Sequence, residues 1–352
     1  MSLGFSTRRP SGSRPRSSGS SDAPKLGQVS TGKRRAPGVT PRHPEGRRLA
    51  GQDKGRDRPV RFDCLMPSAI FRDSLLDNSV AVVSGGGSGI GRTTALELSA
   101  LGARVTICGR RLEPLEATVA LDPHGRIDTA ACDIRDEEQV DAMVEGVLAH
   151  HGQIDLLVNN AGGQFLTPAE NISPKGFRTV IRLNVEGTWN MTYAVATKAM
   201  IPSGRGGKVV SVTLSPHNGM PGMVHSGAAR AAVENMMRTL SIEWARFGIR
   251  LCAVAPGQIE TDTFRDKYPA DVVAASSEGV PLGRLGDPEE IAWMIAFLAS
   301  PAGDFVSGAV LTVDGARDNW YGTWPPANVA DERGSLQAEA RRPSIAASGD
   351  GA

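Results

Sequence analysis

A glycine-rich turn between a short apolar run and a helical stretch is the feature that most constrains how this chain can fold. The apolar residues 80–83 predict a buried strand, and the residues Arg92–Leu101 have a helical pattern. Glycine permits tight turns and close approach of another group, and a helix start offers unpaired N–H groups and a positive dipole end. A strand before and a helix after such glycines distinguish a dinucleotide pyrophosphate site from an ordinary loop. The expected lining residues are Gly85, Ser88, Gly89, Ile90 and Gly91.

Strand and helix patterns alternate from Val80 to Val313. Short apolar runs predict seven buried parallel strands, at residues 80–83, 104–108, 127–132, 154–158, 208–214, 249–254 and 309–313. Helical patterns lie between these runs. One of them places five apolar residues on a single helix face, namely Val140, Met143, Val144, Val147 and Leu148. Capping residues before proline predict helix starts at Ser173-Pro174 and Asp287-Pro288. The pattern predicts an α/β fold, a single doubly wound Rossmann domain with a seven-stranded parallel sheet, whose ligand lies at the carboxyl ends of the strands.

The two ends of the chain differ from this central domain, which we place at residues 66–318. Residues 1–65 carry 15 basic and 5 acidic side chains, against 24 and 33 in the remainder. Since their apolar periodicity is almost nil, we expect a disordered basic extension. We favour two interpretations of this extension: it is an inert tail, or translation starts at Met66 and the extension lies upstream. A nucleic-acid-binding arm and an organelle transit peptide are the less favoured alternatives, so we expect no nucleic-acid partner. Residues 319–352 predict an irregular tail.

Composition favours a reducing compartment and a chain outside the membrane. No apolar run reaches the roughly 20 residues that a membrane span requires, so we expect no membrane partner. No metal-ligand spacing is visible, so we expect no metal, and the C-terminal residues carry no peroxisomal address. The cysteines form no C-x-x-C pair and three fall within predicted strands, so we expect core thiols in a cytoplasmic protein: they are Cys64, Cys108, Cys132 and Cys252.

Three ordered motifs resemble the short-chain dehydrogenase/reductase family. Its first signature matches G-x-x-x-G-x-G at residues 85–91, its second matches Asn159-Asn160-Ala161-Gly162 after the fourth strand, and a third matches Pro256-Gly257 after the sixth. The resemblance covers Leu76 to Asp318 and implies a homo-oligomer, a dimer or tetramer. It also implies that the cofactor contacts Asp133, Ile134, Asn160, Pro256, Ile259 and Thr261. For Asp133 the alternative is an ordinary residue at the end of a strand.

The end of the second strand favours NADP(H) over NAD(H). It reads Gly109-Arg110-Arg111, without the acidic residue that would accept hydrogen bonds from the adenine-side ribose. Arg110 can instead pair with a 2′-phosphate. The alternative is a solvated basic turn.

The catalytic positions depart from the family's usual set of Ser, Tyr, Lys and Asn. Ser226 stands at the Tyr position, Arg230 at the Lys position, and Thr213 at the Ser position, whereas Asn184 is retained. In ordinary members the tyrosine protonates the carbonyl oxygen as hydride arrives. Arg230 stays charged, so it can hold the nicotinamide ribose but cannot donate a proton near neutral pH. None of the tyrosines lies in this segment: they are Tyr193, Tyr268 and Tyr321.

This loss favours reduction of a carbon–carbon double bond. A reduced ketone needs a nearby acid, whereas hydride addition to an enoyl thioester builds charge on an oxygen that hydroxyl or N–H donors stabilise. Residues 159–170 and 224–231 are similar to the trans-2-enoyl-CoA reductase branch of the family, which carries the same Ser and Arg replacements, and the related 2,4-dienoyl-CoA reductases lack the tyrosine but keep the lysine.

The resemblance implies NADPH-dependent reduction of an acyl-CoA double bond. Ser226 and Thr213 would polarise the thioester oxygen, Arg230 would hold the ribose, and Asn184 would order the site. Gln164 and Phe165 would lie beside the nicotinamide and the acyl chain; the alternative is that they form an ordinary loop.

Two other hypotheses stay open. The first keeps an oxidoreductase but assigns a 3-oxoacyl or other carbonyl substrate and a different acid, for which His217, His225 and Tyr193 are the weaker candidates. The second is an NADP-binding regulator that has lost catalysis, and its support is the missing Tyr-x-x-x-Lys pair.

Overall fold

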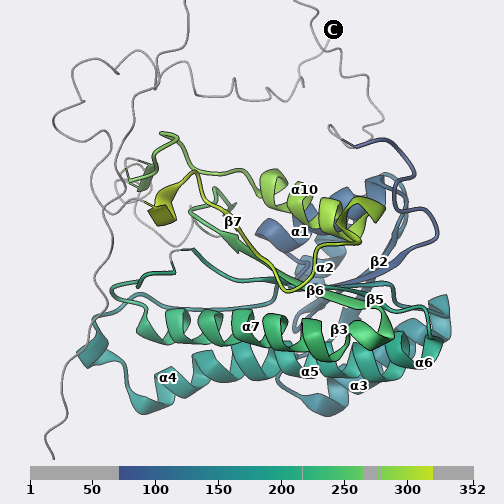
Figure 1. Cartoon of the computed structure of the whole chain (residues 1–352), viewed down its shortest axis with the longest axis horizontal. Coiled ribbons are helices and arrows are strands. Elements are labelled where there is room, and N and C mark those ends of the chain that lie inside the picture. Colours follow the sequence, from purple (N-terminus) through teal and green to yellow (C-terminus); the bar gives the residue numbers. More distant parts are fainter. Residues whose placement is uncertain (1–70, 216, 263, 265–275, 278, 320–352) are drawn as a thin grey trace, which may run out of the picture. The chain divides into compact units, whose positions relative to one another are not determined.

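The computed structural model describes residues 71–215, 217–262, 264, 276–277 and 279–319, which belong to the unit Arg61–Ala352. Within them a parallel sheet of seven strands has the order β3-β2-β1-β4-β5-β6-β7 (Figure 1). The predicted α/β fold with a seven-stranded parallel sheet is therefore confirmed. The strands are β1 (Val80–Ser84), β2 (Arg104–Gly109), β3 (Ile127–Ala131), β4 (Leu156–Asn159), β5 (Gly207–Val212), β6 (Ile249–Pro256) and β7 (Val310–Val313).

The strand order reverses between β1 and β4, and this reversal places the site. The chain first moves outward from β1 to β3, then returns to the other side of β1 and moves outward again to β7. β1 pairs with β2 through Val82 and Thr106, and with β4 through Val82 and Leu157. In an open parallel sheet, the loops after two such diverging strands leave a crevice for a ligand. The glycine-rich turn follows β1 and the Asn159-Asn160 motif ends β4, so both lie at this crevice.

Helices cover both faces of the sheet, because its strands are apolar on both sides. One face packs on α1 (Gly89–Ala100), α2 (Leu112–Val119) and α10 (Pro288–Ala299), and the other on α3 (Glu137–His151), α5 (Gly187–Val195) and α7 (Val224–Glu243) (Figure 1). Successive residues of one strand serve opposite faces. Val82 belongs to the cluster with Met191 and Met237, and Val83 to the cluster with Leu98 and Ile295.

Local signals set the helix ends that the sequence predicts. The Asp136 carboxylate accepts a hydrogen bond from the Gln139 N–H at the start of α3, and Gly152, with φ of 77°, ends this helix in the left-handed conformation. Ser173 caps α4 (Pro174–Ile181) by accepting from the Gly176 N–H. Asp287 forms a capping box with Glu290 at α10. The predicted starts at Ser173-Pro174 and Asp287-Pro288 are confirmed.

Shorter helical turns complete the described chain. Two stretches have the wider π-helical pattern, η2 (Arg182–Glu186) before α5 and η3 (Ala196–Met200) after it, and α6 (Ile201–Ser203) follows η3. The 3₁₀ turns are η1 (Ala169–Asn171), η4 (Ala245–Phe247), η5 (Pro301–Gly303) and η6 (Arg317–Asn319).

The predicted strands agree with the observed ones to within two residues. The largest differences are of two residues each: β4 begins at Leu156 rather than at residue 154, β5 ends at Val212 rather than at residue 214, and β6 ends at Pro256 rather than at residue 254. Cys108, Cys132 and Cys252 are buried free thiols, as expected for core residues. Residues 1–65, residues 320–352 and Tyr268 lie outside the described residues. Among the helices that are described, none combines the length and apolar character needed to cross a membrane.

Candidate active site

The glycine-rich turn is held closed by Asn160, from the loop after β4. The Asn160 amide Nδ2 donates to the carbonyl oxygens of Ser84, at 3.0 Å, and Gly85, at 3.2 Å. Gly85 has φ of 71°, and a Cβ on Gly91 would lie 2.3 Å from the Gly85 oxygen. Only glycine therefore fits at residue 91 while the turn keeps this shape. The predicted motif residues of β1 and β4 form one structural unit.

The start of α1 has the properties of an anion site. Its first turn carries no acidic residue, and the side chain of the N-cap residue Ser88 makes no capping hydrogen bond within the described chain. The early N–H groups of a helix point away from its body and need an external acceptor. Gly89, with φ of 50°, lies 3.3 Å from the Thr261 methyl group, measured from an added Cβ. These residues fit the pyrophosphate of a dinucleotide at the start of α1, with Thr261 beside Gly89.

The adenine side of the crevice is basic. Arg110, after β2, is exposed and makes no hydrogen bond or ion pair with any residue that the structure describes. Asp133, after β3, instead binds Arg135, with 2.8 Å between Arg135 Nε and Asp133 Oδ1. This hydrogen bond lowers the pKa of Asp133, and the charge of Arg110 lowers it further. The buried Ile134 packs closely against Gly187 of α5.

Ser226 lies in the first turn of α7, where its hydroxyl donates to Gln164 Oε1 at 2.7 Å. Their chain neighbours also pair: the ring of Phe165, which follows Gln164, meets the ring of His225, which precedes Ser226, edge-on at 4.2 Å between centroids. Burial lowers the pKa of His225, so its imidazole is neutral at pH 7 and a weak proton donor. Ser226, Gln164 and Phe165, predicted from separate segments, are therefore brought together.

Arg230, one turn after Ser226, places its guanidinium under the loop that follows β4. Its Nη1 donates to the Val212 carbonyl oxygen at 2.9 Å, and its Nε is buried without a partner among the described residues. A Cβ on Gly162 would lie 2.4 Å from Nη2. Burial lowers the pKa of Arg230 to about 10, so the group is still a cation at neutral pH. The unpaired N–H fits a ribose hydroxyl of the dinucleotide as its acceptor.

Asn184 orders the loop rather than pointing a free amide at the crevice. It lies in the π-helical stretch η2, is fully buried, and accepts from the Gly163 N–H at 3.2 Å. Its Nδ2 donates to the carbonyl oxygens of Gly163, at 2.8 Å, and Val180, at 2.9 Å. Irregular helical turns of this kind are frequent at functional sites. All polar atoms of the Asn184 side chain thus hold the segment that faces Arg230.

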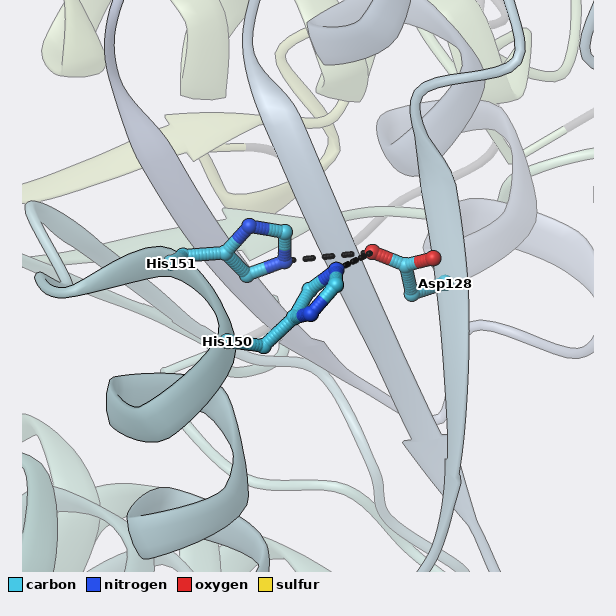
Figure 2. Close-up of side chains that lie close together, drawn as sticks. All are labelled: Asp128, His150 and His151. Atoms are coloured by element: carbon cyan, nitrogen blue, oxygen red, sulfur yellow. Dashed lines mark hydrogen bonds and ion pairs between the residues drawn. The ribbon is translucent and has the colours of Figure 1, made fainter.

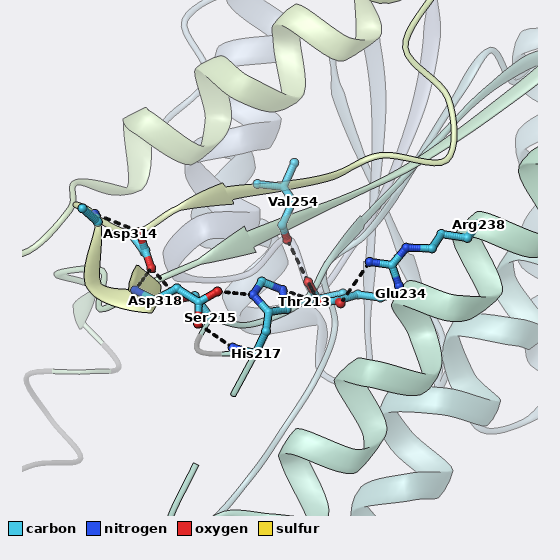
Figure 3. Close-up of polar contacts among 9 residues, drawn as sticks. Thr213, Ser215, His217, Glu234, Arg238, Val254, Asp314 and Asp318 are labelled. Carbon is cyan, nitrogen blue, oxygen red and sulfur yellow. Dashed lines mark hydrogen bonds and ion pairs between the residues drawn. The ribbon is translucent and has the colours of Figure 1, made fainter. Parts of the chain in front are cut away.

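Thr213 belongs to a polar network around Glu234, one turn after Arg230 on α7 (Figure 3). Its hydroxyl lies 3.1 Å from Glu234 Oε1 and 3.3 Å from the Val254 carbonyl oxygen, and both of these atoms are acceptors. His217 Nε2 lies 3.0 Å from the same Glu234 oxygen, and His217 Nδ1 pairs with Asp318. The network ties the loop after β5 to α7 and to the chain after β7.

The charges around His217 set its protonation. Burial alone would lower the pKa of His217, but the hydrogen bond to Asp318 and the negative charges of Glu234 and Asp318 outweigh it, so the pKa is raised. A second contact, 2.6 Å between the Ser215 hydroxyl and Asp314 Oδ2, joins the same two loops. Sequence reasoning missed Glu234 and Asp318. The spacing of Ser226, Arg230 and Glu234, four residues each, could have indicated a shared face of α7.

The profile of the enoyl-(acyl carrier protein) reductase family matches residues 85–316. The chain is 34% identical over 256 residues to a probable 2,4-dienoyl-CoA reductase of Bacillus subtilis, covering 71% of this chain and 100% of that one. It is 36% identical over 261 residues to a peroxisomal 2,4-dienoyl-CoA reductase of Pongo abelii, covering 72% and 88%.

Solved structures show the same fold. A citronellol catabolism dehydrogenase of Pseudomonas aeruginosa is 45% identical and covers 71% of this chain and 98% of its own, with a TM-score of 0.64. A short-chain dehydrogenase of Bacillus anthracis is 35% identical, with coverage of 71% and 99% and a TM-score of 0.65. The fold and site define an oxidoreductase with a dinucleotide crevice. The chain belongs to the enoyl-(acyl carrier protein) reductase family of short-chain dehydrogenases/reductases.

Proposed function

We propose that the protein reduces the carbon–carbon double bond of trans-2-enoyl-CoA thioesters with NADPH, in fatty acyl metabolism. The observation that carries the proposal is the Ser226–Arg230 pair of α7, which occupies the place of a Tyr–Lys pair and faces Gln164 and Gly162 across the crevice. Its relatives named as dienoyl-CoA reductases support a substrate of the acyl-CoA class. The exposed, unpaired Arg110 supports NADPH over NADH.

Each residue of the site has a separate role in the proposed reduction. When bound, NADPH would supply the hydride for the β-carbon of the enoyl group, and water would supply the proton for the α-carbon. The Ser226 hydroxyl turns from Gln164 to the thioester oxygen and stabilises the charge that builds there. Thr213 is the weaker donor, because its one hydroxyl proton already faces the Glu234 carboxylate and the Val254 carbonyl oxygen. Arg230 binds the ribose, and Asn184 keeps the loop at Gly163 in place.

The test is NADPH oxidation by the full chain, followed by absorbance, with a medium-chain trans-2-enoyl-CoA, a 2,4-dienoyl-CoA and a 3-oxoacyl-CoA. Turnover of the enoyl substrate, faster with NADPH than with NADH, is expected. Loss of one oxyanion donor lowers kcat by a factor of about 10²–10³, so the kcat of Ser226→Ala should be lower than that of the wild type by this factor. The control Ser241→Ala makes the same change on the same helix, where the hydroxyl donates to the Arg238 carbonyl oxygen. Equal activity of wild type and Ser226→Ala would contradict the assigned role.

Carbonyl chemistry is the second candidate, favoured by the 45% identity to a citronellol catabolism dehydrogenase. Citronellol with NADP⁺ is therefore assayed beside the thioesters. Turnover of the 3-oxoacyl or alcohol substrates alone would assign carbonyl chemistry and a different acid. Micromolar NADPH binding without turnover of any substrate would instead support a non-catalytic regulator.

We further propose a cytoplasmic homo-oligomer, a dimer or tetramer. The buried free thiols support a reducing compartment. The rings of Trp189 and Tyr193 on α5 are partly exposed and 5.5 Å apart, which supports an apolar contact between copies. Light scattering after size-exclusion chromatography measures the mass in solution, and a monomer at micromolar concentration would contradict the proposal.

A further inference from the structure

Three potential metal ligands lie close together (Figure 2). They are at the amino-terminal end of the sheet, away from the glycine-rich turn that follows β1. Asp128 is the second residue of the edge strand β3, and His150 and His151 are the last two residues of α3. Gly152 then turns the chain in the left-handed conformation. Because β3 begins beside the end of α3, one carboxylate and two imidazoles face one another.

The distances between these ligands suit one bound ion. His151 Nε2 lies 3.1 Å and His150 Nε2 lies 3.9 Å from Asp128 Oδ2, and all three atoms lie within 4.8 Å of one another. Ligands about 2.0–2.2 Å from a tetrahedral zinc ion are separated from each other by about 3.3 Å. Asp128 and His151 already meet this spacing. The His150 side chain is 70% exposed, so it can close the remaining gap without disturbing the core.

The position of His151 favours metal binding. Its side chain is 4% exposed, so the protein holds the imidazole in place beside Asp128. The negative end of the α3 dipole lies at the same point and stabilises a cation.

The surroundings select the class of ion. The cluster lines a cavity of about 460 Å³, whose other charged residues are Asp77, Arg104 and Arg126. The two arginines balance Asp77 and Asp128, so a calcium or magnesium ion finds no net negative charge and only a few oxygen ligands. Imidazole nitrogens instead suit zinc and its neighbours. The cavity leaves room for water as a fourth ligand.

We propose that Asp128, His150 and His151 form a binding site for a divalent transition-metal ion such as Zn²⁺. The ion joins the end of α3 to the edge strand β3. It lies at the opposite ends of the strands from Ser226 and Arg230, so it stabilises the fold and takes no part in hydride transfer. The proposal is thus independent of the substrate.

The test is isothermal titration of Zn²⁺ into the full chain after dialysis against a chelator, at neutral pH. We expect one ion bound with a micromolar Kd, no heat with Mg²⁺, and a rise in the unfolding temperature with Zn²⁺. His150→Gln and Asp128→Asn each remove a ligand from a surface position. Mutation of a residue that merely orients a metal ligand lowers metal affinity by about 10–100-fold, so loss of a ligand itself should lower the Zn²⁺ affinity at least tenfold.

The matched control is His124→Gln, a histidine outside the cluster. It should bind Zn²⁺ as the wild type does, and the unfolding temperatures without metal show that all variants fold. Bound Co²⁺ should give the strong visible absorption of a tetrahedral site in the wild type, and this signal should be lost in His150→Gln. No binding at micromolar Zn²⁺, or binding unchanged in His150→Gln and Asp128→Asn, would overturn the proposal.

Discussion

Replacing Gly162 by alanine should disable the site while leaving the fold in place. Gly162 lies in the loop after β4, and an added Cβ would be 2.4 Å from Arg230 Nη2 and 2.7 Å from Asn184 Oδ1. Ordinary contacts are 3.4–4 Å, so both side chains must move by about 1 Å. Neither is free to move, since Arg230 binds the Val212 carbonyl oxygen and Asn184 binds Gly163.

The size of the effect follows from these contacts. A displaced hydrogen bond costs about 0.5–1.5 kcal/mol, so two displaced bonds lower the free energy of unfolding by about 1–3 kcal/mol. A displacement of about 1 Å in a positioned group can cost about 100-fold in rate. Gly162→Ala should therefore show a small loss of stability, a weaker NADPH complex, and a kcat/KM that is about 100-fold lower.

The assays are urea unfolding, NADPH titration by fluorescence, and turnover of trans-2-enoyl-CoA. The control is Gly146→Ala in α3, where an added Cβ meets no atom within 4 Å. Since glycine weakens a helix interior, this variant should gain about 0.5–1 kcal/mol and keep its activity. If Gly162→Ala binds NADPH as tightly as the wild type and unfolds at the same urea concentration, the packing argument is refuted.

Three further predictions concern other parts of the chain. Arg110→Asp should weaken NADPH binding at least about tenfold more than NADH binding, and titrations showing equal losses would argue against a 2′-phosphate contact. His217 has a raised pKa in the folded protein, so its contribution to stability is complete below about pH 6.5 and is lost as pH rises through the raised value. Unfolding temperatures of wild type and His217→Asn should therefore converge as pH rises, and a difference independent of pH would contradict this linkage. Asp136→Ala removes the cap of α3 and should lower the free energy of unfolding by about 1 kcal/mol. An unchanged urea midpoint would show that the cap does not stabilise the fold.

The sequence alone was sufficient for the parts of this protein that depend on neighbours along the chain. The apolar runs, the caps at Ser173 and Asp287, and the glycine-rich turn each express a local backbone preference or a simple period. Parallel strands joined by helices then allow few topologies, so the doubly wound fold and the edge of the sheet that carries the site followed as well.

Only the tertiary structure decided which side chains meet. Ser226 and Gln164 are 62 residues apart, and no local pattern states that their polar atoms lie 2.7 Å from each other. The same holds for Glu234, whose contacts with Thr213 and His217 depend on how α7 packs against the loop after β5. Asp128 meets His150 and His151 because an edge strand begins where a helix ends. Local preference is a property of short segments, whereas hydrogen bonding, burial and protonation depend on groups that folding brings together from distant positions.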